Sequence, residues 1–457
     1  MEQSNEQRLG TLPIPKLMLS LAIPSVIAQI INVLYNIVDR IYIGHMSDVG
    51  DIALTGVGVT FPIIMLISAF SYFVGSGGAP LASIQLGRQN KEKAEQILGN
   101  GTSLLILFSI VLTLFFFFFK TPLLYLFGAS NSTIIYANDY LDVYLLGTIF
   151  VQLSLGLNLF ISSQGQAKTA MLSVLIGAVT NIVLDPIFIF GLHMGVRGAA
   201  TATVISQAFS AIWVVSFLSS KRSVIRIRLR YLKPDFEIVK HIASLGISPF
   251  IMQSTESLIN IVLNHSLQLY GGDIYVGSMT IIQSVMQLIV VPIQGFTQGV
   301  QPIISYNFGA SQFERVKKTF FYTVITTFLL TTLSCILTTK FPTFFARFFT
   351  DKESLIFIVG EVMPIFMSGI FMFGIQMGCQ TAFMGLGQAK ISLFLALLRK
   401  VILLVPLAIL LPLIYGTVTS IYYAEPISDI LSATIAGILF FVTRKKILSP
   451  QALERIS

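Results

Sequence analysis

Two aspartates inside long apolar segments are the residues whose chemistry stands out first. Asp39 follows Tyr35 by four residues in the segment 17–43, and Asp185 follows Asn181 by four residues in the segment 169–191. A spacing of four places two side chains on the same face of a helix, so each segment carries a narrow polar stripe. An ionisable group at membrane depth is costly, and it is therefore a functional candidate by default.

If the two stripes meet, both carboxyl groups share a pocket of low dielectric, where they cannot comfortably ionise together. One of the two would then hold a proton near neutral pH and could load and release it. A sodium ion bound by the oxygens of Asp39 and Asp185 is the competing interpretation, and a static pair with Arg40 or a hydroxyl group is the structural one. Asn158 and Thr203 are expected neighbours of this cluster, although ordinary interhelical hydrogen bonds explain them equally well.

The second half of the chain has charged residues of its own in apolar segments. Glu256 could bind a cationic substrate or couple to an ion, or it could be held in a buried ion pair with Arg399 or Lys400. Glu425 and Asp429 are again spaced by four residues, and functional and structural roles stay open for both. The residues expected to line the substrate path are Glu256, Gln253, Asn32 and Asn260.

Two prolines are expected to affect the helices that carry the aspartates. Pro24 lies inside the segment of Asp39 and should bend it, so that protonation of Asp39 could change the shape of the helix. Pro186 follows Asp185 directly and deprives the carbonyl group of Ile182 of its helical hydrogen bond.

The segments that must position these residues dominate the composition. Of the 457 residues, 54% are hydrophobic and only 11% are charged, whereas a soluble protein carries about 25% charged residues. We therefore predict an all-α polytopic membrane protein with twelve transmembrane helices. The expected spans are 17–43, 53–86, 97–119, 133–163, 169–191, 196–219, 239–269, 274–308, 317–339, 354–385, 391–414 and 417–443.

The orientation follows from the positive charges in the loops. With a cytoplasmic N-terminus, 21 Lys and Arg residues fall in inner segments and 5 in outer loops. Inner loops of membrane proteins are enriched in these residues, so both termini are predicted to be cytoplasmic. The net charge of +8 thus reflects topology and indicates no binding of nucleic acid. The alternation Arg226, Arg228 and Arg230 suits a segment that lies on anionic lipid.

An internal repeat divides the chain into two halves. The tetrapeptide Gly-Gln-Ala-Lys at 165–168 recurs at 387–390, and at this same offset Pro80, Ser83 and Gly87 recur as Pro302, Ser305 and Gly309. Six spans in each half give both halves the same orientation and predict two pseudo-symmetric six-helix bundles. The expected organisation is an N-terminal tail (1–16), an N-lobe (17–219), a linker (220–238), a C-lobe (239–443) and a C-terminal tail (444–457).

Other kinds of site find little support. The two cysteines lie in apolar segments, and the four histidines are scattered, so we expect neither a disulfide nor a zinc site. No nucleophile triad or phosphate-binding loop indicates an enzyme. We expect no cofactor, and we expect a monomer whose partners are the lipid bilayer, H+ or Na+, and small cationic or amphipathic organic substrates.

The sequence resembles the multidrug and toxic compound extrusion (MATE) transporters of bacterial type. The stretch from Val38-Asp39 to Gly44 resembles their span-1 motif, and the stretch from Asn181 through Asp185-Pro186 to Gly191 resembles their span-5 motif. The Gly-Gln-Ala-Lys loops add to the likeness, which covers nearly the whole chain. The resemblance implies efflux of organic cations driven by H+ or Na+ and a V of two lobes that opens outward.

The resemblance also implies roles for individual residues. Pro24 would be the bending proline of span 1, and Glu256 would match an acid on span 7 that some branches use. The chain departs from those branches on span 10, where 369–380 holds no carboxylate. The coupling cluster implied in the N-lobe consists of Tyr35, Asp39, Asn158, Asn181, Asp185 and Thr203.

The leading hypothesis is therefore an antiporter in the plasma or inner membrane that exports organic cations in exchange for H+ or Na+ by alternating access. The alternative is a flippase of lipid-linked oligosaccharides, from a related transporter class. A flippase should have a more cationic central cavity to bind pyrophosphate, and the acids of the N-lobe argue against it.

Overall fold

In a computed structural model, residues 5–46 and 50–454 are described, and every regular element in these two ranges is a helix. Residues 1–4 and 455–457 of the two expected tails, which include Arg455, lie outside the described part. The all-α prediction is thereby confirmed.

The first half contains α1 (Asn5–Thr11), α2 (Ile14–Gly44), α3 (Gly50–Gly87), α4 (Lys91–Leu126), α5 (Ile134–Leu146), α6 (Thr148–Ser162), α7 (Ala167–Pro186), the π-helix η1 (Ile187–Gly191) and α8 (Gly195–Ser219). Helix α2 carries Asp39 and α7 carries Asp185. The short 3-10 helix η2 (Leu229–Tyr231) is the regular element between the two halves in the described chain.

The second half contains α9 (Phe236–Gly271), α10 (Asp273–Gly309), α11 (Phe313–Lys340), α12 (Pro342–Arg347), α13 (Glu353–Met367), α14 (Ile370–Gly385), α15 (Ala389–Leu397), the π-helix η3 (Leu398–Leu404), α16 (Val405–Tyr415), the 3-10 helix η4 (Val418–Tyr423), α17 (Ala424–Ile447) and α18 (Pro450–Glu454). Glu256 lies on α9, and Arg399 and Lys400 lie on η3.

Length and hydropathy qualify most of these helices as membrane spans. Within residues 5–46 and 50–454, nine helical segments are long and apolar enough to cross a membrane. The number rises to 11 if each of two pairs of helices joined at a bend is taken as one span. Helix α9 is not among these 11, but it has 36 residues and lies at the position of the expected span 239–269. With α9, a helical segment occupies each of the twelve expected span positions. The polar residues of α9, among them Glu256 and Asn260, explain why its hydropathy is lower than that of the other spans.

The two bent spans break at equivalent positions of the repeat. The α5–α6 pair bends by 60° at Gly147, and the α13–α14 pair bends by 44° next to Gly369, the counterpart of Gly147 in the second half. A Cβ atom on Gly147 would lie 2.5 Å from Val204, and one on Gly369 would lie 2.4 Å from Pro426. Val204 and Pro426 are themselves counterparts in the repeat, so the same close approach of the fourth and sixth spans occurs in each half.

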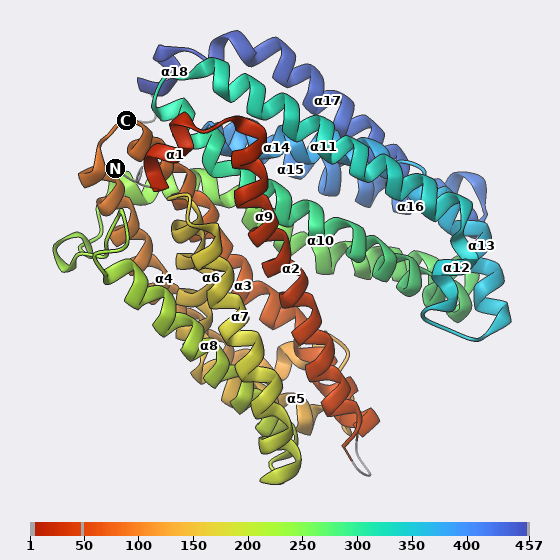
Figure 1. Ribbon diagram of the computed structural model, residues 1–457. Helices are drawn as coiled ribbons and strands as arrows, with labels where there is room; N and C mark the ends of the chain where they lie inside the picture. Colours follow the sequence, from red (N-terminus) through yellow and green to blue (C-terminus); the bar gives the residue numbers. More distant parts are fainter. Residues whose placement is uncertain (1–4, 47–49, 455–457) are drawn as a thin grey trace.

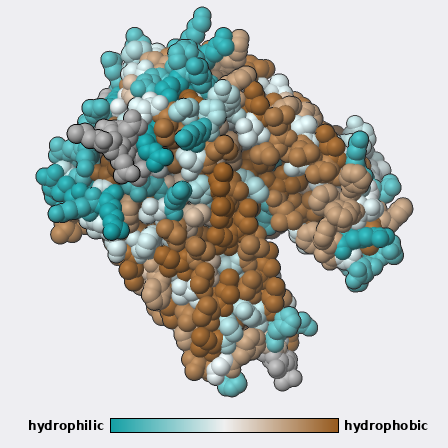
Figure 2. Space-filling model, viewed as in Figure 1, coloured by the Kyte–Doolittle hydropathy of each residue, from teal (hydrophilic) through white to brown (hydrophobic). Residues whose placement is uncertain are grey.

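The helices form two bundles that share one end and diverge at the other (Figure 1). Helices α1 and α18 lie together at the shared end. Hydrophobic side chains cover much of both arms, polar ones gather at the shared end, and the arms stand apart at their far ends (Figure 2). This is the surface expected of a membrane protein whose apolar sides face lipid.

The bundles meet where α3 crosses α10 near the shared end. Cβ atoms added to Gly87 and Gly309 would lie 2.0 Å from the backbone oxygens of Tyr306 and Ile84 respectively. These two glycines are equivalent in the repeat. Their backbones touch the opposite helix directly, which closes this end of the molecule.

The segment between α8 and α9 folds back onto the first bundle. The guanidinium group of Arg228 donates to Glu95 at 2.7 Å, and Glu95 is buried. In contrast, the side chains of Leu229 and Phe236 are 86% and 80% exposed. Exposed apolar residues among basic ones suit the expected position on a lipid surface.

Candidate coupling and substrate sites

The carboxyl groups of Asp39 and Asp185 meet inside the first bundle, within hydrogen-bonding reach of each other. Asp185 is fully buried. One oxygen on each side, Oδ1 of Asp39 and Oδ2 of Asp185, is buried and accepts no hydrogen bond from the described chain. Two ionised carboxylates repel strongly at such a distance, so this arrangement favours a proton or a cation between them.

An amide side chain fixes one side of this carboxyl pair. Asn181 is fully buried, and its Nδ2 donates to Oδ1 of Asp185 at 3.2 Å and to the hydroxyl group of Thr203 at 3.4 Å. Its Oδ1 is buried without a donor in the described chain. The site thus offers several oxygen acceptors and one placed donor, a set that suits either a proton shared by the acids or a hard cation such as Na+.

Three tyrosines surround the acids, and two of them were not among the residues singled out from the sequence. Tyr140 and Tyr144 on α5 are buried and stack with ring centroids 5.9 Å apart. The hydroxyl group of Tyr140 is within hydrogen-bonding reach of Thr203, and that of Tyr35 is within reach of Gln207. Tyr140 and Tyr144 have the same spacing of four as the acid stripes, which is the signal that could have identified them.

Arg40 forms no salt bridge with the carboxyl pair. Its side chain is exposed, and its guanidinium carbon lies 4.4 Å from the centre of the Phe61 ring. In the described ranges no salt bridge joins Asp39 or Asp185 to any Lys, Arg or His. The static alternative that paired Asp39 with Arg40 is therefore not formed in this structure.

The two prolines have different local effects. Helix α2 continues through Pro24, and the hydroxyl group of Ser25 donates to the carbonyl group of Leu21 at 3.0 Å. Pro186 ends α7, and the π-helix η1 follows directly. Asp185 thus stands at a change of helical form, a feature that often accompanies functional sites.

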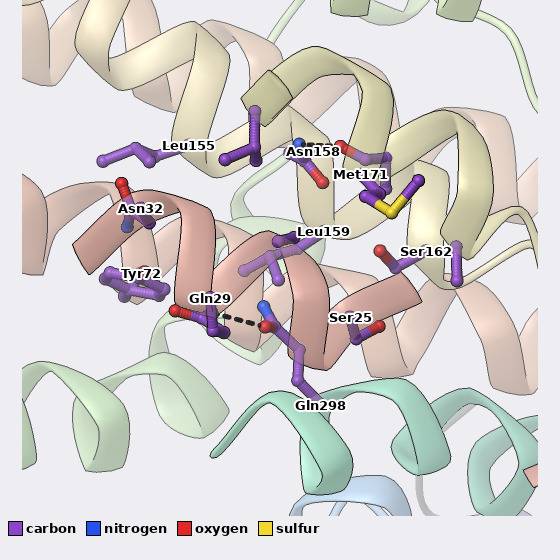
Figure 3. Close-up of a pocket in the computed structure, with 14 residues that line it drawn as sticks. Ser25, Gln29, Asn32, Tyr72, Leu155, Asn158, Leu159, Ser162, Met171 and Gln298 are labelled. Carbon is purple, nitrogen blue, oxygen red and sulfur yellow. Dashed lines mark hydrogen bonds between the residues drawn. The ribbon is translucent and has the colours of Figure 1, made fainter. Parts of the chain in front are cut away.

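A cavity of about 50 Å³ lies within the first bundle, lined by residues of α2, α3, α6 and α7 and, from the second bundle, by Gln298 of α10. Asn32 and Asn158 line it together with Gln29 and Gln298 (Figure 3). Asn158 donates to the carbonyl group of Ala170 at 3.0 Å and also to a serine of α7. Both asparagines therefore belong to this cavity and do not hydrogen-bond to the carboxyl pair.

One hydrogen bond in this cavity joins the bundles. Nε2 of Gln29 on α2 donates to Oε1 of Gln298 on α10 at 2.9 Å, as the dashed line between these two labelled residues in Figure 3 marks. Asp39 lies on the same helix as Gln29. A movement of α2 caused by a change at Asp39 would therefore reach the contact between the bundles.

In the second bundle, Arg399 is held by two acids. Its Nη2 donates to Glu425 at 2.6 Å and its Nε donates to Asp429 at 2.7 Å. All three side chains are buried, and the guanidinium carbon lies 4.6 Å from the centre of the Phe373 ring. The two acids of α17 and Arg399 thus form one closed ionic cluster, which is the structural role left open by the sequence.

Glu256 forms an ion pair with Lys400. The lysine side chain is 6% exposed, whereas that of Glu256 is 56% exposed, so the carboxyl group has a free side that the ion pair does not cover. Gln253, one turn earlier on α9, donates to the sulfur of Met65 on α3 at 3.4 Å. Asn260, one turn later, accepts a hydrogen bond of 2.8 Å from Gln283 on α10.

Comparison with known proteins agrees with this architecture. The model of the MatE family matches the chain twice, over residues 24–187 and again over 249–410. The two matches cover more than half of the chain and reproduce the repeat seen in the sequence.

Named relatives match over nearly their whole length. The chain is 24% identical to the multidrug export protein MepA of Staphylococcus haemolyticus (strain JCSC1435) over 437 residues, which are 96% of this chain and 95% of the relative. It is also 24% identical to MepA of Staphylococcus aureus (strain N315) over 435 residues, 95% of each protein.

Solved structures share the fold. A crystal structure of MATE in the bent conformation has a TM-score of 0.88 and 26% identity, and the match covers 100% of this chain and 99% of the other. A transporter of the MOP superfamily from Pyrococcus furiosus Vc1 (DSM3638) has a TM-score of 0.89 and 25% identity, with 99% and 100% of the chains covered. For that transporter, the reverse polarity of its binding pocket suggests a different function.

Proposed function

Because the chain belongs to the MatE family, whose members are membrane transporters and not enzymes, we propose that it is a multidrug efflux antiporter. It exports small organic cations across the cell membrane in exchange for H+ or Na+. Relatives that match it over nearly the full length are multidrug export proteins, which supports the export of drugs.

The observation that carries the coupling is the carboxyl pair of Asp39 and Asp185. Two acids in contact inside an apolar bundle, each with a buried oxygen that lacks a donor in the described chain, are stable only when a proton or a cation is bound. Loss of that ion leaves repelling charges that favour another arrangement of α2 and α7. Ion binding and helix arrangement are thereby linked, as coupling requires.

The two bundles then alternate between outward-open and inward-open arrangements. In this structure the glycine contact at Gly87 and Gly309 closes the shared end, and the far ends of the arms stand apart (Figure 2). With the basic loops at the shared end, this end is the cytoplasmic one and the molecule opens outward. Both termini then lie in the cytoplasm, and each monomer contains a complete path.

Glu256 supplies the acidic group of the substrate path. Its carboxyl group is half exposed and belongs to the second bundle, away from the coupling acids. Its partner Lys400 lines a small cavity together with Met252, Met377 and Phe373, and side chains of these types suit amphipathic cations. The first bundle thus binds the coupling ion, and the second contributes mainly to substrate recognition.

The flippase alternative requires free positive charge in the central region. Arg399 is bound by Glu425 and Asp429, and Lys400 is bound by Glu256. No net positive charge is left in this cluster for a pyrophosphate group, which favours the efflux of cations.

Dye transport in inside-out vesicles tests the proposed function. H+ and Na+ gradients are imposed separately, and the movement of a cationic dye is followed by fluorescence. One of the two gradients should drive dye movement, and that gradient identifies the coupling ion. Dye movement independent of both gradients would contradict antiport.

A further inference from the structure

We propose that Lys400 is a built-in competitor of the substrate at Glu256. It occupies the carboxyl group when no substrate is bound and moves to Gln380 when a cation with N–H groups arrives. The inference rests on the proposed export of cations and adds a mechanism and a class of ligand to the substrate site.

The ammonium group of Lys400 has two acceptors on α9. It donates to the carboxyl group of Glu256 and, at 2.9 Å, to the backbone carbonyl group of Met252. Lys400 is buried on a helix that packs against α9, while Glu256 faces outward with more than half of its side chain exposed. The acid is therefore accessible to a ligand, and the lysine reaches it from the protein side.

Lys400 differs from its neighbour Arg399 in the number of its acidic partners. Arg399 bridges Glu425 and Asp429, both buried, so releasing it would leave uncompensated charges in an apolar interior. Lys400 has Glu256 as its acidic partner in the described chain, and this partner is half exposed. Water or a ligand can therefore compensate the carboxylate when Lys400 leaves.

The backbone separates the two cations. Both lie on the π-helix η3, where Arg399 points to α17 and Lys400 points to α9. A π-helix is a rare form that often marks functional positions. Here it delivers one cation to a closed ionic cluster and the next residue to the substrate path.

A second position for the ammonium group already exists. Lys400 and Gln380 line the same small cavity, of about 10 Å³, and Oε1 of Gln380 is buried without a hydrogen-bond donor in the described chain. In this orientation Nε2 donates to the backbone carbonyl group of Ser392 at 3.3 Å and to the hydroxyl group of Ser248 at 2.9 Å, and a reversed amide would set its oxygen against that carbonyl group. The oxygen of Gln380 is therefore an unused acceptor in the cavity that Lys400 also lines.

The group that replaces the ammonium must satisfy the same acceptors. The carboxyl group of Glu256 and the carbonyl group of Met252 both accept N–H donors, so the site selects protonated amines, amidines or guanidines. A quaternary ammonium or phosphonium ion has no N–H group and gains only the charge interaction. The site thus distinguishes two kinds of organic cation that have the same charge.

Two substitutions should have opposite effects on binding. Lys400→Met removes the competitor and should tighten binding of a diamidine such as DAPI by about tenfold, the scale of one charged contact. The affinity for tetraphenylphosphonium, which has no N–H group, should increase clearly less in this variant. Gln380→Leu removes the second position, keeps Lys400 on Glu256 and should weaken binding of the diamidine.

Equilibrium binding of both probes to the purified full-length protein in detergent tests this inference without an ion gradient. In a Glu256→Gln background, Lys400→Met and Gln380→Leu should no longer change the affinity, because the group they compete for is gone. Lys120→Met is the matched control, since Lys120 is a lysine with a side chain only 12% exposed that pairs with the 40% exposed Asp142 in the other bundle. Lys400→Gln is a second, separate substitution at the same position. Thermal unfolding of each variant separates a change of affinity from a loss of fold.

The outcomes separate this inference from the proposed function. Wild-type protein that binds both probes supports the export function. The competitor role of Lys400 is wrong if Lys400→Met and Lys400→Gln leave the affinity for the diamidine unchanged. It is also wrong if they change this affinity as much in the Glu256→Gln background as they do in the wild type. If folded wild-type protein binds neither probe, the proposed export of cations fails, and this inference fails with it.

Discussion

The carboxyl groups of Asp39 and Asp185 lie within hydrogen-bonding reach of each other, and no side-chain cation pairs with either in the described part of the chain. The ionic clusters of the second bundle are different, because each acid there has a basic partner. Asp39 and Asp185 are therefore free to exchange an ion, whereas Glu425 and Asp429 are held in place by Arg399.

Asp185→Asn should abolish dye export driven by the ion gradient and leave dye binding in detergent intact. Asparagine keeps the shape of the side chain but cannot carry the charge that the coupling ion balances. Export from vesicles and equilibrium binding are measured on the same preparation. Asp142→Asn, on the outer part of the same bundle, serves as a control and should retain export. Gradient-driven export by Asp185→Asn at the wild-type rate would exclude a role in coupling.

Asn181→Leu should shift the pH profile of export toward higher pH if the coupling ion is H+. Nδ2 of Asn181 donates to Asp185 at 3.2 Å and stabilises the ionised carboxylate. Without this donor the site holds its proton more firmly, so a higher pH is needed to release it. The rate of export at a series of pH values provides the check. A profile that keeps its position would show that Asn181 has only a packing role.

Arg399→Met should destabilise the protein by about 3–5 kcal/mol, the cost of leaving partners of a buried ion pair uncompensated. Glu425 and Asp429 both lose their cation in this variant. The control is Arg197→Met, which breaks the exposed pair with Asp139 and should cost at most about 1 kcal/mol. Thermal unfolding in detergent compares the two, and equal stability of both variants would refute the structural role of Arg399.

Gly369→Ala should lower the amount of folded protein, because its Cβ atom would lie 2.4 Å from Cα of Pro426. Backbone atoms cannot move aside as a flexible side chain can. A Cβ atom on Gly58 meets nothing within 4 Å, so Gly58→Ala should be neutral or slightly stabilising in its helix. Size-exclusion profiles of both variants provide the measurement. Wild-type behaviour of Gly369→Ala would show that the close approach of α14 to Pro426 is not needed for folding.

Much of the fold could be predicted from the sequence, because long apolar runs and a repeat in constant register between the two halves constrain the helices strongly. The meeting of Asp39 and Asp185 could also be anticipated, since lipid excludes both polar stripes from the outer surface. The pair of Glu256 with Lys400 was one of the alternatives that the sequence left open. The binding of Arg399 to Glu425 and Asp429 was not anticipated, because it depends on the direction of side chains on a π-helix that leaves no clear pattern in the sequence. Tyr140 and Gln380 were missed because neutral polar residues are common in membrane helices, and only their placement beside the acids and Lys400 distinguishes them.

Ion release on substrate binding is the most direct test of coupling through the carboxyl pair. A cationic dye is added to purified protein in weakly buffered solution, and released H+ and Na+ are followed with a pH indicator and a sodium electrode. Wild-type protein should release ions of one kind when the dye binds, because reciprocal linkage means that the dye weakens the binding of the coupling ion. The Asp39→Asn variant should bind the dye but release none. Equal ion release by wild type and by the Asp39→Asn and Asp185→Asn variants would contradict coupling at these acids.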